Sequence, residues 1–222
     1  MVKIAPSILA ADFGHLADEV ARVEAAGADL IHIDIMDGHF VPNLTLGPVV
    51  VEAVRKATSL PLEVHLMVTD ADRLIPACIE AGVNGVLVHV EACPHLQRTV
   101  QLIRDRGASP GVAVNPATSL CTLDEILPEA ASVTLMSVNP GFGGQRFLDS
   151  TLEKIRRLRA MLQARALGAA IEVDGGVKPS NAPEIIAAGA EILVSGTGIF
   201  HAKDYATAVA QLRGDPGSAT RR

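Results

Sequence analysis

The feature that most limits the fold of this chain is a pattern that recurs eight times: a short apolar run, a loop and a helical stretch. The runs predicted as strands are 3–9, 29–36, 62–68, 83–90, 111–115, 132–138, 169–174 and 192–195. The helical stretches that follow them are 13–26, 48–57, 71–81, 96–106, 123–127, 150–164, 181–188 and 204–213. Eight such units within 222 residues are what a single (β/α)8 TIM barrel, an α/β fold, requires.

An open doubly wound sheet would show the same alternation, but its dinucleotide-binding fingerprint follows the first strand. The nearest match, Gly196-Thr197-Gly198, comes at the last predicted strand, where no further βαβ unit can follow. No Ser/Gly-rich linker divides the chain, so we predict one catalytic barrel domain over residues 1–213. Residues 214–222 have the composition of a flexible C-terminal tail.

Composition narrows the class of function. A formal net charge of −6 without a basic cluster argues against nucleic acid as a partner. No apolar run approaches the ~20 residues that span a bilayer, and the N-terminal residues lack the layout of a signal peptide. Three widely spaced cysteines, an odd number, indicate a reducing compartment rather than a disulfide framework. We therefore expect a cytoplasmic protein that handles a small molecule and binds no membrane.

Ionisable residues alternate with apolar ones in three predicted strands. Because successive side chains of a strand point to opposite faces, His32 and Asp34 share one face of the second strand. The same argument places His65 of the third strand and Asp174 of the seventh on the corresponding face, near the C-terminal ends. Burying these groups together is prohibitive unless they are paired or bind a cation. We predict that all four bind one divalent metal ion, with Zn, Fe, Mn and Co all suited to a mixed N/O ligand set. For any one strand, a structural His–Asp pair is the alternative.

Two further groups lie near this predicted centre. Glu63 and Glu172 fall one layer below it, where they could orient the histidines. Met36, Met67 and Met136 end strands two, three and six on the predicted inner face. Methionine usually fills a core, and the functional alternative is a hydrophobic collar that excludes water from the metal site.

Glycine-rich loops follow the last three predicted strands. They are Asn139–Gln145, which contains Gly141, Gly143 and Gly144, then Gly175-Gly176, and finally Gly196-Thr197-Gly198. Glycine lets backbone N–H groups approach an anion closely, and TIM barrels often bind phosphate after strands seven and eight. Tight turns are the alternative for a single loop. Three together predict a phosphorylated small molecule that extends from these loops to the metal.

A metal with two carboxylates suits hydrolysis, or proton transfer next to a carbonyl group. Asp34 and Asp174 come from strands far apart around the predicted ring, so they could address opposite faces of a planar intermediate. With one carboxylate as base and the other as acid, a stereocentre would be inverted.

The chain also resembles a known family over nearly its whole length. The matching stretches are APSILAADF (5–13), HIDIMDGHFVPN (32–43), HLMV (65–68), SVNPGFGGQ (137–145) and EVDGG (172–176), and they resemble the ribulose-phosphate 3-epimerase family. The resemblance implies a TIM barrel of the ribulose-phosphate-binding type that interconverts D-ribulose 5-phosphate and D-xylulose 5-phosphate through an enediolate. Such an enzyme serves the pentose phosphate pathway and the Calvin cycle, and the family's multimeric habit implies a homo-oligomer.

The resemblance also implies residue roles. Asp34 would accept the proton and Asp174 would donate it, both within a metal site completed by His32 and His65. Residues expected to contact the sugar phosphate are Ser7, His65, Gly141, Phe142, Gly143, Gly144, Asp174, Gly175, Gly176, Gly196 and Thr197. The chain departs from the family at residues 195–198, Ser-Gly-Thr-Gly here, where Ala-Gly-Ser-Ala is more frequent.

Three other functions compete with this one. The first is the same reaction on another ketose phosphate, such as allulose 6-phosphate. The second is a non-catalytic sugar-phosphate-binding barrel, which would not explain two carboxylates across the ring. The third is a metal-dependent phosphohydrolase, which would need the metal beside the phosphate rather than at the opposite end.

Overall fold

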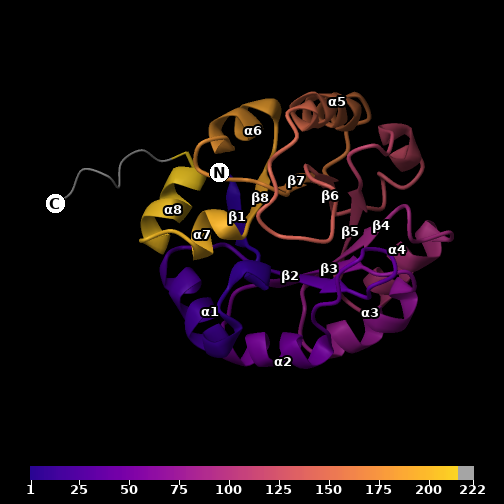
Figure 1. The fold of residues 1–222 in the computed structure, drawn as a ribbon. Helices are drawn as coiled ribbons and strands as arrows, with labels where there is room; N and C mark the ends of the chain where they lie inside the picture. The colour runs from indigo at the N-terminus through magenta and orange to yellow at the C-terminus, as the bar shows by residue number, and fades with distance from the viewer. Residues whose placement is uncertain (215–222) are drawn as a thin grey trace.

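Eight parallel strands form a nearly closed ring in the computed structural model, which describes residues 1–214, and the helices lie outside it (Figure 1). The strands are β1 (Lys3–Pro6), β2 (Ile31–Met36), β3 (Leu62–Met67), β4 (Gly85–His89), β5 (Ser109–Val114), β6 (Ser132–Met136), β7 (Ala170–Asp174) and β8 (Ile192–Ser195). Their order in the sheet is β1-β8-β7-β6-β5-β4-β3-β2. The predicted (β/α)8 TIM barrel is confirmed.

The seam between β1 and β2 closes the ring through few contacts. Ser7 and His32 form an isolated parallel bridge, and the Asp29 amide donates to the Ile4 carbonyl at 3.0 Å. Asp29 Oδ2 also accepts from the Ile4 amide at 2.7 Å. These bonds bring Ser7, at the end of β1, next to the ionisable face of β2.

An α-helix follows each strand except β5, and two follow β8. The helices are α1 (Leu16–Ala25), α2 (Pro48–Ala57), α3 (Ala71–Glu80), α4 (Leu96–Asp105), α5 (Ser150–Ala164), α6 (Ala182–Ala188), α7 (Thr197–Phe200) and α8 (Tyr205–Leu212). Ile31, Ile33 and Ile35 of β2 are buried in one large apolar cluster with residues of the surrounding helices. The opposite face of β2 is therefore free to line the barrel interior.

Two predicted elements are wrong in detail, and one short helix was not predicted. The first strand ends at Pro6, and the 3-10 turn η1 (Ile8–Ala10) follows, capped by the Ser7 hydroxyl. The helix expected at 123–127 is absent, and a 3-10 turn, η3 (Leu120–Leu123), stands in its place. Pro128 follows that stretch and disfavours helical geometry at the residue before it. The short helix α7 was not predicted, because Gly196 and Gly198 lower helix propensity there.

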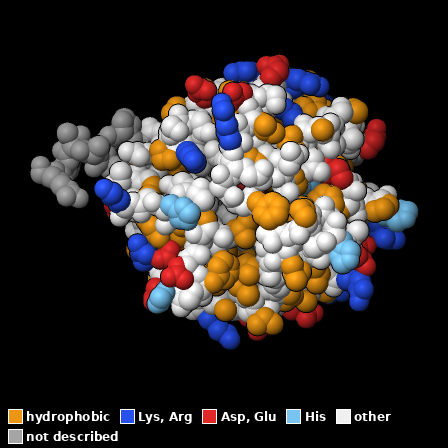
Figure 2. All heavy atoms as spheres, in the orientation of Figure 1, with side chains coloured by type: hydrophobic (Ala, Val, Ile, Leu, Met, Phe, Trp, Pro, Cys, Tyr) orange, Lys and Arg blue, Asp and Glu red, His pale blue; other side chains and the backbone are white. Residues whose placement is uncertain are grey.

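A space-filling view from the same side shows hydrophobic side chains gathered toward the middle of this face, with most charged side chains nearer the rim (Figure 2). Within residues 1–214, no helix is both long enough and apolar enough to cross a membrane. Most of the predicted C-terminal tail, residues 215–222, lies outside the described residues.

Candidate active site and metal centre

Strand register brings the predicted ligands together. In the parallel pairing of β2 with β3, His32 lies beside Glu63 and Asp34 lies beside His65. Asp174 ends β7, and Met136 of β6 is its register partner. Because all strands run in one direction, these C-terminal ends meet at one mouth of the barrel.

The four predicted metal ligands form one cluster, in which Asp174 is partly exposed and the other three are buried. His65 Nδ1 lies 3.2 Å from Asp34 Oδ1 and 3.5 Å from Asp174 Oδ2. His32 Nε2 lies 3.4 Å from Asp34 Oδ1 and 4.0 Å from Asp174 Oδ2. One ligand atom from each of the four residues can be chosen so that all lie within 4.8 Å of one another. The cluster is thus able to hold a metal ion.

An unpartnered nitrogen supports this assignment. His32 is fully buried, and its Nδ1 contacts Glu63 Oε1 at 3.2 Å. Its Nε2 has no hydrogen-bond partner among residues 1–214. A neutral imidazole that donates from Nδ1 presents its lone pair at Nε2, and a lone pair facing two carboxylates suits a cation between them. The donor set, two imidazoles and two carboxylates, fits a transition metal or zinc.

The electrostatics of the cluster keep Asp34 ionised. Burial alone would raise the pKa of Asp34, but the neighbouring His32 and His65 outweigh burial and hold it well below its usual range. The same contacts act in reverse on the histidines. Burial lowers the pKa of His32, and Asp34 then raises it above its ordinary value.

The two oxygens of Asp34 face different partners. Oδ1 points to the histidines, whereas Oδ2 accepts a hydrogen bond from the Ser7 hydroxyl at 2.6 Å. One oxygen is therefore placed toward the metal position and the other toward the cavity side, where Ser7 also lies.

The two glutamates below the cluster behave differently from each other. Glu63 contacts His32, as expected for a residue that orients a ligand. Glu172 makes no hydrogen bond to a histidine within residues 1–214, although one ligand atom each of His32, Glu63 and Glu172 can be chosen within 4.8 Å of one another. Its Oε1 accepts from Thr134 Oγ1 at 3.0 Å, and its Oε2 has no partner among the described residues. Burial raises the pKa of Glu172 well above its usual value, and the neighbouring charge of Glu63 raises it further. Glu172 is thus more easily protonated than an exposed glutamate.

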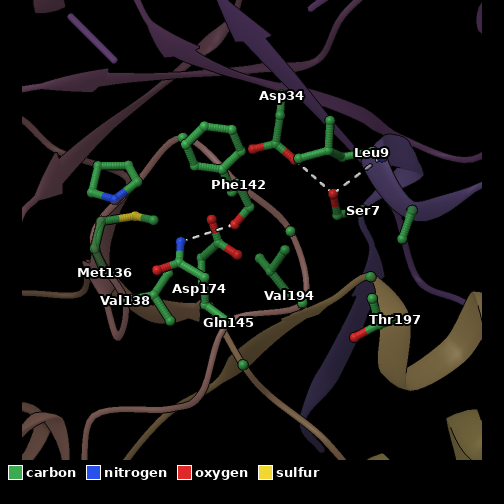
Figure 3. A pocket seen from close by; sticks show the side chains of 18 of the residues that line it. Ser7, Leu9, Asp34, Met136, Val138, Phe142, Gln145, Asp174, Val194 and Thr197 are labelled. Carbon is green, nitrogen blue, oxygen red and sulfur yellow. Dashed lines mark hydrogen bonds between the residues drawn. The ribbon is translucent and has the colours of Figure 1, made fainter. Parts of the chain in front are cut away.

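Residues lining the cavity above the cluster include most of those expected to contact substrate (Figure 3). They include Ser7, Asp34, Gly141, Phe142, Gly143, Gly144, Asp174, Gly175, Gly176, Gly196, Thr197 and the three methionines Met36, Met67 and Met136. His32 and His65 lie deeper, fully buried beneath this cavity. The three methionines are each only 2% exposed, so they form an apolar wall between cavity and core.

The three glycine loops are tied to one another. The Ser137 hydroxyl donates to the Gly175 carbonyl at 2.6 Å, and the Ser195 hydroxyl donates to the Val177 carbonyl at 2.8 Å. Gly175 and Gly176 adopt φ values of +116° and +64°, which favour glycine. No Lys or Arg is among the described residues lining the cavity, so its available donors for an anion are backbone N–H groups and neutral side chains such as the Thr197 hydroxyl.

Sequence reasoning overlooked two residues next to the metal cluster. His89, fully buried at the end of β4, contacts His65 through a pair of Nε2 atoms 2.9 Å apart. Its Nδ1 contacts Glu91 Oε2 at 3.1 Å. The alternation used for β2, β3 and β7 also applies to β4, where Gly85, Leu87 and His89 share a face, and it would have found His89.

The sequence of residues 3–200 matches the model of the ribulose-phosphate 3 epimerase family. The chain belongs to this family. Ribulose-phosphate 3-epimerase of Bacillus subtilis (strain 168) is 50% identical over 215 residues, covering 96% of this chain and 99% of the relative. Ribulose-phosphate 3-epimerase of Escherichia coli (strain K12) is 46% identical over 213 residues, covering 96% and 95%. The predicted enzyme class, an epimerase, is confirmed, and family membership supports pentose-phosphate epimerase activity.

Solved structures at low identity show the barrel fold alone. 3-Hexulose-6-phosphate synthase has a TM-score of 0.69 at 23% identity and covers 97% of this chain and 99% of its own. KGPDC from Streptococcus mutans has a TM-score of 0.70 at 15% identity, with 97% of each chain covered. The barrel is shared at these identities, so the epimerase chemistry rests on the site and the family.

Proposed function

We propose that this family member interconverts D-ribulose 5-phosphate and D-xylulose 5-phosphate by proton transfer at C3 between Asp34 and Asp174. The observation that supports this most directly is the placement of two carboxyl groups that approach one cavity from different sides of the ring (Figure 3). Asp34 comes from β2 and Asp174 from β7, and each also has an oxygen within 4.0 Å of the same histidines.

Asp34 acts as the base that removes the C3 proton. Its low pKa keeps it ionised at neutral pH, and the Ser7 hydrogen bond fixes the direction of Oδ2. Loss of the proton gives a planar enediolate. Asp174 then donates a proton to the opposite face of C3, so the configuration is inverted. In the reverse direction the two residues exchange roles.

His32, Asp34, His65 and Asp174 would hold one divalent metal ion, with Zn, Fe, Mn and Co as the candidates. When bound, such an ion supplies a Lewis acid that polarises the ketone oxygen and stabilises the developing negative charge. The methionine wall excludes water from the carbanion-like carbon. Backbone N–H groups of the glycine loops bind the phosphate, and this places the sugar between phosphate and metal.

Two further expectations complete the proposal. The partner is a small sugar phosphate rather than nucleic acid or membrane, and the enzyme works as a homo-oligomer in the cytoplasm. Light scattering on the purified protein decides the oligomeric state, and a monomer would contradict that part alone.

Deuterium exchange tests the reaction. In deuterated water, metal-replete enzyme converts ribulose 5-phosphate to xylulose 5-phosphate and replaces the C3 proton with deuterium, both followed by NMR. Asp34→Asn and Asp174→Asn each abolish interconversion while the circular dichroism spectrum is unchanged. Asp105→Asn, at the exposed end of α4, is the matched control and retains full activity.

Two outcomes would contradict the proposal. Absence of both exchange and product in the metal-replete wild type removes the proposed reaction. An active Asp34→Asn variant removes Asp34 as the base. Because both aspartates are also proposed ligands, the metal content of each variant is measured alongside its activity.

A further inference from the structure

A line of three side chains runs from the metal cluster to the surface: His65 and His89, which are buried, and Glu91, which is partly exposed. The His65 and His89 rings are stacked, with centroids 5.0 Å apart and planes 21° apart. Phe40 packs on His89 with a centroid distance of 4.8 Å. Both histidines are fully buried, while the Glu91 side chain is 22% exposed. Packing therefore fixes the His89 ring, and Glu91 forms the outer end of the line.

Glu91 is anchored by groups that do not belong to the metal cluster. Its Oε1 accepts from the Asn115 amide at 2.7 Å and also from the Thr118 hydroxyl. Its Oε2 is thereby directed at His89 Nδ1. Burial opposes ionisation of Glu91, but hydrogen bonds from His89, Thr118 and Asn115 lower its pKa to about 2. Glu91 is thus an ionised carboxylate that can only accept.

The direction of every hydrogen bond in the line follows from this end. Since Glu91 only accepts, His89 Nδ1 carries the hydrogen and donates it. A neutral His89 then has its lone pair at Nε2. The contact of 2.9 Å with His65 Nε2 is a hydrogen bond only if His65 is the donor there. A neutral His65 that donates from Nε2 has its lone pair at Nδ1, the atom that faces Asp34 and Asp174.

We propose that His89 and Glu91 are positioning residues that fix the tautomer of His65, so that its Nδ1 lone pair is presented to the metal position. The proposal rests on the metal site of the proposed function and extends it to two residues that touch neither metal nor substrate. It gives His65 the counterpart of the Glu63 contact that fixes His32. Hydrogen-bond partners of metal-ligating histidines commonly set ring orientation and tautomer in this way.

Glu91→Gln is the most direct test because glutamine has the same shape as glutamate but can donate to His89 Nδ1 instead of accepting from it. If the amide oxygen of the introduced glutamine still accepts from the Asn115 amide, its amide nitrogen faces His89 Nδ1 and donates to it. His89 would then donate from Nε2, and the hydrogen of His65 would move to Nδ1. We expect Zn²⁺ affinity, measured by competition with a chromophoric chelator, to fall about 10- to 100-fold. ¹⁵N NMR of histidine-labelled, zinc-free enzyme should show exchanged His89 tautomers.

Two variants of His89 separate hydrogen bonding from packing. His89→Phe retains a ring against Phe40 but has no nitrogen, and Zn²⁺ affinity should fall by a similar factor. His89→Gln offers an amide oxygen to His65 Nε2–H and should restore most of the affinity. His95→Phe and Glu129→Gln, which alter exposed or partly exposed side chains away from the cluster, are the matched controls and should bind Zn²⁺ like the wild type.

Unchanged Zn²⁺ affinity in both Glu91→Gln and His89→Phe overturns the proposal. So does a His89→Gln variant as weak as His89→Phe, because packing alone would then explain the loss. A wild-type enzyme that binds no Zn²⁺, Co²⁺ or Mn²⁺ overturns instead the metal site of the proposed function. The two failures are therefore distinguishable. Thermal unfolding of each variant identifies any that fail to fold.

Discussion

Replacing Ser7 with alanine removes the hydroxyl that donates to Asp34 Oδ2 at 2.6 Å. Both residues are buried, at 6% and 4% exposed, so water does not readily replace the lost donor. A hydrogen bond to a charged group contributes about 1.5–3 kcal/mol. If that stabilisation orients the base in the transition state, kcat falls roughly 10- to 100-fold, at 1.36 kcal/mol for each factor of ten.

The pH profile gives this prediction a second readout. A hydroxyl that donates to a carboxylate favours its charged form, so its loss raises the pKa of Asp34. Asp34 is then protonated at a higher pH than in the wild type, so the acidic limb of the kcat/KM profile shifts to higher pH. The assay is the conversion of ribulose 5-phosphate by metal-replete enzyme across a pH series.

A matched control separates this effect from a general loss of stability. Ser59→Ala removes a hydroxyl–carboxylate bond of 2.9 Å to Glu24 at the exposed end of α2, far from the cavity. It should leave both kcat and the profile unchanged. Ser7 also caps η1, so Ser7→Ala should cost about 1 kcal/mol of stability, measured by urea unfolding. A Ser7→Ala enzyme with wild-type kcat and an unmoved acidic limb refutes the reasoning.

Two further predictions concern the glycine loops. At Gly176 a Cβ would lie 2.5 Å from the Phe147 amide nitrogen, so Gly176→Ala should raise KM and lower the free energy of unfolding in urea by about 1–3 kcal/mol. Gly168→Ala, where a Cβ would meet open space, is the control and should change neither quantity. Equal KM values for the two variants would contradict this prediction. At Gly198 a Cβ would lie 2.4 Å from Ser195 Oγ and 2.9 Å from the Val177 carbonyl oxygen, so Gly198→Ala should be destabilising. Adding Ser195→Ala relieves only the contact with Oγ and should therefore recover part of the loss, about 1 kcal/mol, in a double-mutant cycle; additive effects would disprove the coupling.

The Ser195–Gly198 pair gives the departure from the family pattern a physical reason. The family more often has alanine at both positions, and here one side chain gains an oxygen where the other loses a Cβ. The Ser195 hydroxyl occupies that space and donates to the Val177 carbonyl at 2.8 Å. Glycine at position 198 thus leaves room for the Ser195 hydroxyl and for the Val177 carbonyl, which would lie 2.9 Å from a Cβ, and the loops after β7 and β8 are in contact.

Strand periodicity alone predicted the ring and its ionisable face. Residues of β2 alternate between faces whatever lies around them, so His32 and Asp34 share a side as soon as the strand forms. The absence of the helix predicted at 123–127 also has a local cause, because Pro128 disfavours helical geometry at the residue before it. Features that depend only on residues close together in the sequence can therefore be predicted without the structure.

Only the tertiary structure decided which atoms of these residues meet. Asp34 receives its hydrogen bond from a residue 27 positions earlier, and His65 contacts His89, 24 positions later. These contacts depend on barrel closure and on the side-chain rotamers that packing selects. The sequence by itself determined that a His/Asp cluster would line a barrel. The structure decided that Asp34 Oδ1 faces the two histidines while Oδ2 accepts a hydrogen bond from Ser7. It also decided that His89 contacts His65 and that Glu91 contacts His89. Alternation is a property of one strand, whereas hydrogen-bond partners depend on how separate strands are brought together in space.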